Sequence, residues 1–119
     1  MQTGIDTKKI PENHPDRRRH PRYRFSVPLT IRGADGLAIR AISMEISESG
    51  LSAITADSLK VGDTVELETI VASKVIAIVR HNVGRVYGLE FLHLTAEQAQ
   101  RITERCKMLP RYEGKSLGI

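Results

Sequence analysis

Between residues 25 and 94, short stretches of alternating apolar and polar residues recur at intervals of about ten residues, separated by turns rich in glycine. A period of two places successive side chains on opposite faces of a β-strand. Predicted strands cover residues 25–32, 37–46, 51–55, 65–69, 74–81 and 85–94; residues 75–79 are apolar throughout, which predicts a central strand there. About six short strands at this spacing predict a small antiparallel barrel or sandwich. Closure into a barrel would also protect the first strand, where Pro28 lacks an N–H and marks an edge or an irregularity.

The period changes after residue 94 and predicts one C-terminal helix. Thr95 and Gln98 have the spacing of a capping box, in which the two side chains satisfy N–H groups at a helix start. Pro110 predicts the end of the helix. The apolar positions at helical spacing between them are Ala99, Ile102, Cys106 and Leu109.

The second strand, residues 37–46, changes phase along its length. Its first half places Ile39 and Ala41 on one face, whereas its second half places Ile42, Met44 and Ile46 on one face. A slip of one residue near positions 41–42 predicts a β-bulge, or a strand that bends between two faces.

The length of 119 residues predicts a single domain. We expect a flexible lead-in over residues 1–16, the barrel with its helix over 17–109, and a flexible tail over 110–119. No apolar run is long enough to span a bilayer, and the chain start lacks the apolar core of a signal peptide. With a lone cysteine, these features favour a cytoplasmic location.

The positive charge is concentrated at the start of the chain. Residues 1–24 hold seven basic and three acidic groups, and this difference equals the whole net charge of +4. Five of the basic groups are arginines within residues 17–24, and Pro21 favours an extended arm over a helix there. A neutral body with a basic arm indicates an anionic partner.

Arginine suits such a partner because its planar guanidinium pairs with phosphate and with guanine O6 and N7 in bidentate fashion. A second polar segment, Glu45-x-Ser47-x-x-Gly50, follows the end of the second strand. A carboxylate and a hydroxyl can bind a guanine edge, and glycine allows close approach of a flat ligand. Alternatively, the segment is a tight strand connection whose serine caps the turn, and the arm is a solvated charge run.

Catalytic and metal-binding patterns are missing from the sequence. It contains no G-x-S-x-G, no P-loop and no G-x-G-x-x-G. The four histidines, at positions 14, 20, 81 and 93, lack the spacing of metal ligands. We therefore expect a protein that is not an enzyme and that uses no metal or cofactor. Nucleic-acid binding through the arm is disfavoured because few aromatic residues are available to stack on bases.

Taken together, the two segments resemble the PilZ domain, a family of bacterial cyclic-di-GMP receptors. Its arginine motif matches Arg17-Arg18-x-x-x-Arg22, and its (D/N)-x-S-x-x-G motif matches residues 45–50 at the serine and the glycine. Further similarities are the Val-Pro-Leu of residues 27–29, the Val-Gly-Asp turn of 61–63 and the Gly-Leu-Glu-Phe of 88–91. The resemblance covers about residues 17–108.

This resemblance implies a six-stranded antiparallel barrel with a C-terminal helix and cyclic-di-GMP on its surface. It implies that the arm wraps over the ligand on binding and so changes the surface offered to an unidentified effector protein. The residues it implies for ligand binding are Arg17, Arg18, Arg22, Glu45, Ser47 and Gly50.

Glu45 departs from the family pattern, which has Asp or Asn at this position. Glutamate keeps the carboxylate but adds one methylene, about 1.5 Å of reach, and on the order of 0.5–1.5 kcal/mol of side-chain entropy to restrict. A lost bond beside a buried guanine costs about 1–3 kcal/mol, which would weaken binding about tenfold or more. The alternative is a degenerate PilZ module that acts as a ligand-independent adaptor.

Overall fold

A computed structural model describes residues 21–110 of the chain. The predicted lead-in, arm residues 17–20 and residues 111–119 lie outside this part. The strands are β2 (Tyr23–Arg24), β3 (Pro28–Arg32), β4 (Ala38–Ile46), β5 (Gly50–Ile54), β6 (Thr64–Glu68), β7 (Val75–Val83) and β8 (Val86–Leu92). The helix is α1 (Ala96–Lys107).

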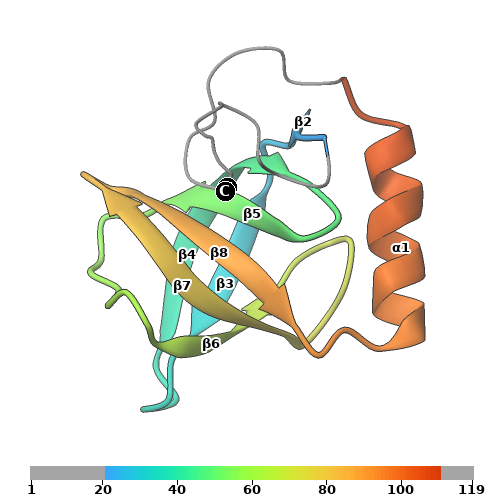
Figure 1. Cartoon of the computed structure of the whole chain (residues 1–119). Coiled ribbons are helices and arrows are strands. Elements are labelled where there is room, and N and C mark those ends of the chain that lie inside the picture. The colour runs from blue at the N-terminus through green and yellow to red at the C-terminus, as the bar shows by residue number, and fades with distance from the viewer. Residues whose placement is uncertain (1–20, 111–119) are drawn as a thin grey trace, which may run out of the picture.

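The sheet is antiparallel, and its order is β2-β4-β3-β6-β7-β8-β5. An additional pairing of β4 with β5 joins the two sides, so β3 to β8 form a closed six-stranded barrel, with α1 lying along one side (Figure 1). This confirms the predicted barrel with a C-terminal helix and decides against the sandwich. The two-residue strand β2, which the alternation pattern did not predict, pairs only with the end of β4 among the described strands.

Side chains alternate across the barrel wall as the sequence predicted for most strands. Leu29 and Ile31 of β3, Val65 and Leu67 of β6, and Leu89 of β8 are all buried in the core. The core is therefore supplied by the inward positions of strands on all sides of the barrel.

The phase of β4 differs from the prediction. Its register against β5 shifts between Ser43 and Glu45, so the bulge lies later than positions 41–42. Ile42 therefore stays on the outer face and is 44% exposed, whereas the sequence placed it with Met44 and Ile46. The buried inward position is occupied by Ser43, whose polarity hid the continuing alternation.

Helix α1 begins with the predicted capping box. The Thr95 hydroxyl accepts a hydrogen bond from the Gln98 N–H, and the Gln98 side chain accepts one from the Thr95 N–H. The Gln98 amide also donates to the carbonyls of Ser73 and Lys74, which fixes the helix start against the loop between β6 and β7. Within the described residues, no helix has the length and apolar character needed to cross a membrane.

The buried side of α1 includes Ile102 and Cys106. Burial, followed by the charge of Glu48, raises the pKa of the Cys106 thiol to about 11. Because the folded pKa is raised from its ordinary 9.0, the thiol favours the folded state below pH 9, and this contribution is lost as the pH rises through 11. At neutral pH Cys106 is a core residue and not a nucleophile.

Candidate functional site

The described end of the basic arm is attached to the barrel through β2. Tyr23 and Arg24 pair with Ile46 and Glu45 at the end of β4. The backbone N–H of Arg24 also donates to the Pro110 carbonyl, with 3.0 Å between nitrogen and oxygen. These bonds fix the arm at the point where it enters the fold, directly beside the second predicted segment.

A buried ion pair joins the two predicted halves of the site. Nε of Arg22 lies 3.2 Å from Oε1 of Glu45. The Glu45 side chain is 1% exposed and that of Arg22 is 9% exposed. Water screens a pair this deeply buried only weakly, so each charge depends strongly on the other.

Ser43 ties the irregular segment before β3 to the middle of β4. Its hydroxyl donates to the carbonyl of Phe25 and accepts from the N–H of Val27 at 3.0 Å. The N–H of Ser43 donates to the Val27 carbonyl at 2.9 Å. This buried serine therefore sets the path of the chain that leads out of the arm, a role that sequence reasoning missed.

Ser47 holds the turn between β4 and β5. Its N–H donates to the Gly50 carbonyl at 2.8 Å, and its hydroxyl accepts from the Ser49 N–H at 3.1 Å. The side chain is 1% exposed. The structure thus bears out the turn-capping role weighed from the sequence, and it places this turn directly after Glu45.

Gly50 allows β5 to approach β8 closely. A Cβ added at this position would overlap the backbone carbonyl oxygen of Leu89 and crowd the Cα of Glu90. Gly50 is not in the left-handed region. The fold therefore requires glycine here for the contact between two strands, and the approach to a ligand suggested by the sequence stays a prediction.

We expect Gly50→Ala to lower the free energy of unfolding by roughly 1–3 kcal/mol, because backbone atoms must move to admit the methyl group. Urea denaturation would measure the change. Gly33→Ala is the matched control, since the added Cβ would meet only a side-chain oxygen of Asp35 at 3.3 Å. Equal losses in the two variants would contradict the close strand contact.

A small hollow adjoins the turn and extends the site to β7 and β8. Its volume is about 160 Å³, and Ser49, Gly50, Arg80 and Glu90 are among the residues that line it. Arg80 and Glu90 form an exposed ion pair with 2.6 Å between Nε and Oε1. Sequence reasoning missed both residues, because only the closure of the barrel brings β7 and β8 next to the turn.

The predicted site residues fall into two groups. The structure brings together Arg22 and Glu45 through their ion pair, and Ser47 and Gly50 through their turn. Arg17 and Arg18 lie outside the described residues. Among residues 21–110, no group of three or more His, Cys, Asp or Glu side chains could hold a metal ion.

The described residues thus form a closed antiparallel barrel with a C-terminal helix and a buried ion pair between Arg22 and Glu45. The model of the PilZ domain family matches residues 16–107, most of the chain. The protein therefore belongs to the PilZ domain family. A search of curated proteins gave no match.

Solved structures share this fold. The inhibitor of motility MotI/DgrA of Bacillus subtilis aligns with a TM-score of 0.63 and 23% identity over 78% of this chain. The chain spans about half of that protein, 51% of its length. The PilZ domain of YcgR from Escherichia coli, solved with c-di-GMP, aligns with a TM-score of 0.63 and 14% identity. That alignment covers 79% of this chain and 92% of the YcgR domain.

The PilZ domain of CeSA from a cellulose-synthesizing bacterium aligns with a TM-score of 0.59 and 13% identity. It covers 73% of this chain and 95% of the CeSA domain. At these identities the similarity shows the fold alone.

Proposed function

We propose that this protein is a receptor for cyclic-di-GMP that acts through a partner protein and catalyses no reaction. The observation that carries the proposal is the contact between Arg22 and Glu45, which joins the arginine arm to the second motif at one place on the barrel. Membership of the PilZ family and the presence of c-di-GMP in the YcgR structure support the choice of ligand.

The ligand chemistry fits the side chains that meet at this place. Cyclic-di-GMP offers two phosphates and two guanines. In our proposal, Arg17, Arg18 and Arg22 bind phosphate and guanine O6 and N7. Glu45 accepts hydrogen bonds from the guanine N1 and N2 groups, with Ser47 and the backbone at Gly50 completing that side. Arg80, which lines the adjoining hollow, offers a guanidinium plane on which a base can stack.

Binding must also change the partners of Arg22. The Arg22 guanidinium faces Glu45, so a bound phosphate would have to share or replace that carboxylate. The exchange would move residues 17–22 over the ligand and alter the surface around β2. A partner protein that recognises this altered surface would receive the signal.

A second function, that of a ligand-independent adaptor, is favoured by one observation. Glu45 is almost completely buried and already paired with Arg22. Such a pair can also serve only to stabilise the fold. The two functions predict different responses to cyclic-di-GMP: a receptor binds it, and a ligand-independent adaptor does not.

Thermal denaturation of the full chain with cyclic-di-GMP tests the proposal, and cyclic-di-AMP is the matched control. At a ligand concentration of 100 times Kd, binding stabilises a folded protein by about 2.7 kcal/mol, which raises Tm by several degrees for a domain of this size. We expect this rise with cyclic-di-GMP only, because adenine lacks the adjacent N1–H and N2 amino donors that guanine offers to the Glu45 carboxylate. An unchanged Tm with both dinucleotides would favour the adaptor.

A further inference from the structure

One buried hydroxyl beside the candidate site has no hydrogen-bond partner. Ser52 lies in the middle of β5 and is 0% exposed. Among the described residues, no donor or acceptor pairs with its Oγ. The buried serines Ser43 and Ser47 differ from it, because each hydrogen bonds to backbone groups. A buried hydroxyl without a partner is costly and rare in a folded protein, so its presence calls for a physical reason.

Ser52 is the cross-strand neighbour of Glu45. The register pairs these two residues where β4 meets β5. Directly opposite residues of antiparallel strands point to the same face, with their Cβ atoms about 4.5–5.5 Å apart. On its other side β4 pairs with β2, where Arg24 is the residue opposite Glu45. Glu45 therefore stands between the arm on one side and the Ser52 hydroxyl on the other.

The Glu45 carboxylate is turned toward the arm. Its Oε1 lies 3.2 Å from Nε of Arg22, the residue directly before β2. The register also pairs Ser52 with Gly88 of β8, which has no side chain that could bond the hydroxyl. Of the two residues directly opposite Ser52, only Glu45 therefore offers a polar side chain.

We propose that Ser52 is a positioning residue that donates a hydrogen bond to Glu45 when the ligand engages Arg22. This role rests on the proposed function, in which a bound phosphate shares or replaces the carboxylate beside Arg22. A carboxylate whose contact with a cation weakens in so buried a place requires another donor. It has room for about four hydrogen bonds, so Glu45 can accept from Ser52 and from guanine N1 and N2 together. The Ser52 bond then orients the carboxylate toward the guanine edge.

The exchange gives the unpaired hydroxyl opposite effects on folding and on binding. Without ligand, Ser52 lowers the stability of the chain, because its hydroxyl is buried without a partner. With ligand, the same hydroxyl stabilises the complex through Glu45. A serine that only supported the fold would act in one direction, because its loss would lower stability and any loss of affinity would follow from that.

Ser52→Ala tests this role through two measurements on the full chain. The Tm of the variant should stay the same or rise by a few degrees, because an unpaired buried hydroxyl is removed. Its affinity for cyclic-di-GMP, measured by calorimetry, should fall at least about tenfold, as expected for one hydrogen bond to a charged group. In a Glu45→Gln background the same substitution should cost only about threefold, because a neutral amide oxygen accepts a weaker bond.

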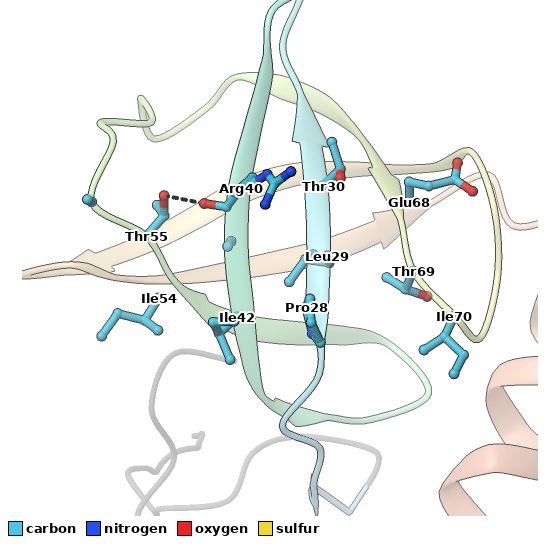
Figure 2. Close-up of a pocket in the computed structure, with 12 residues that line it drawn as sticks. Pro28, Leu29, Thr30, Arg40, Ile42, Ile54, Thr55, Glu68, Thr69 and Ile70 are labelled. Carbon is cyan, nitrogen blue, oxygen red and sulfur yellow. Dashed lines mark hydrogen bonds between the residues drawn. The ribbon is translucent and has the colours of Figure 1, made fainter.

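Thr55→Ala is the matched control, one residue after the end of β5. Thr55 is buried, and its hydroxyl donates to the Arg40 carbonyl at 2.9 Å (Figure 2). It lines a groove of about 560 Å³ that contains none of the predicted ligand-binding residues. Loss of this bonded hydroxyl should lower Tm and leave the affinity for cyclic-di-GMP unchanged, the reverse of the result expected for Ser52→Ala.

These variants distinguish the role of Ser52 from the proposed function. If the unmodified chain binds no cyclic-di-GMP, both fail. If it binds and Ser52→Ala binds equally well, only the role of Ser52 fails. A Ser52→Ala variant that loses Tm and affinity together would show a serine that supports the fold. An undiminished loss of affinity in the Glu45→Gln background would show that Ser52 contacts the dinucleotide directly. Either of these last two results overturns the positioning role.

Discussion

Replacing Glu45 by alanine is expected to lower the free energy of unfolding by about 3–5 kcal/mol, as observed when one member of a buried ion pair is removed. The Glu45 side chain is 1% exposed and faces the Arg22 guanidinium at 3.2 Å. Its removal takes away the carboxylate that faces a largely buried guanidinium, since the Arg22 side chain is only 9% exposed. Because small domains are stable by only about 5–15 kcal/mol, urea denaturation should show a large shift of the midpoint.

Two controls separate the ion pair from the loss of a side chain. Glu90→Ala removes a partner of Arg80 from an exposed pair, 51% and 47% accessible, and should cost less than about 1 kcal/mol. The double variant Arg22→Leu/Glu45→Leu removes both charges and should recover much of the lost stability. Glu45→Ala and Glu90→Ala variants of equal stability would contradict a buried pair of this strength.

Glu45→Asp distinguishes the structural task of the carboxylate from its task toward a ligand. Aspartate is shorter by one methylene, about 1.5 Å, so its contact with Arg22 lengthens and the free energy of unfolding falls. Affinity for cyclic-di-GMP should be kept or improved, because the shorter side chain holds Arg22 less firmly. Weaker binding by the aspartate variant would show that this site is adapted to glutamate.

Replacing Arg22 by lysine is expected to reduce the affinity for cyclic-di-GMP at least about tenfold while leaving the chain folded. Lysine keeps a positive charge beside Glu45 but loses the planar fork that pairs with phosphate and guanine. Each lost charge-assisted bond is worth about 1.5–3 kcal/mol. Arg22→Ala should abolish measurable binding. Anisotropy of a fluorescent cyclic-di-GMP derivative gives the affinity, and circular dichroism checks the fold.

Arg32→Ala is the matched control for Arg22→Ala. Arg32 lies at the end of β3, and its guanidinium donates to the Gly36 carbonyl at 2.9 Å on the exposed hairpin. Its removal lowers the net charge by the same amount without touching the site. If Arg32→Ala and Arg22→Ala weaken binding equally, the arm acts through general electrostatic attraction and Arg22 has no specific task.

Much of the barrel was predictable because strands such as β3 and β6 alternate without interruption. Val65 and Leu67, like Leu29 and Ile31, face inward as their period of two predicts. The bulge predicted in β4 is present, but it lies between Ser43 and Glu45 and not at positions 41–42, because the buried inward position is a serine. Ser43 satisfies its hydroxyl with backbone groups of Phe25 and Val27, contacts that depend on a segment sixteen to eighteen residues away. The pattern of hydrophobicity therefore placed Ile42 on the same face as Met44 and Ile46.

The candidate site was predictable as a set of motifs, but its internal contacts were not. The sequence identified Arg22, Glu45, Ser47 and Gly50 as members of one site. It assigned Glu45 to the ligand, whereas the structure pairs it with Arg22 through the short strand β2. Arg80 reaches the turn only because β8 pairs with both β5 and β7. Pairing between strands that are distant in the chain leaves no local signal in the sequence.

Isothermal titration calorimetry of the full chain with cyclic-di-GMP tests the central claim most directly. At tens of micromolar protein, we predict saturable heat for the unmodified chain and a markedly weaker isotherm for Arg22→Lys measured under the same conditions. Circular dichroism of the same samples establishes that both proteins are folded. An unmodified, folded chain that gives no heat with cyclic-di-GMP would contradict the receptor function and leave the adaptor as the function of this barrel.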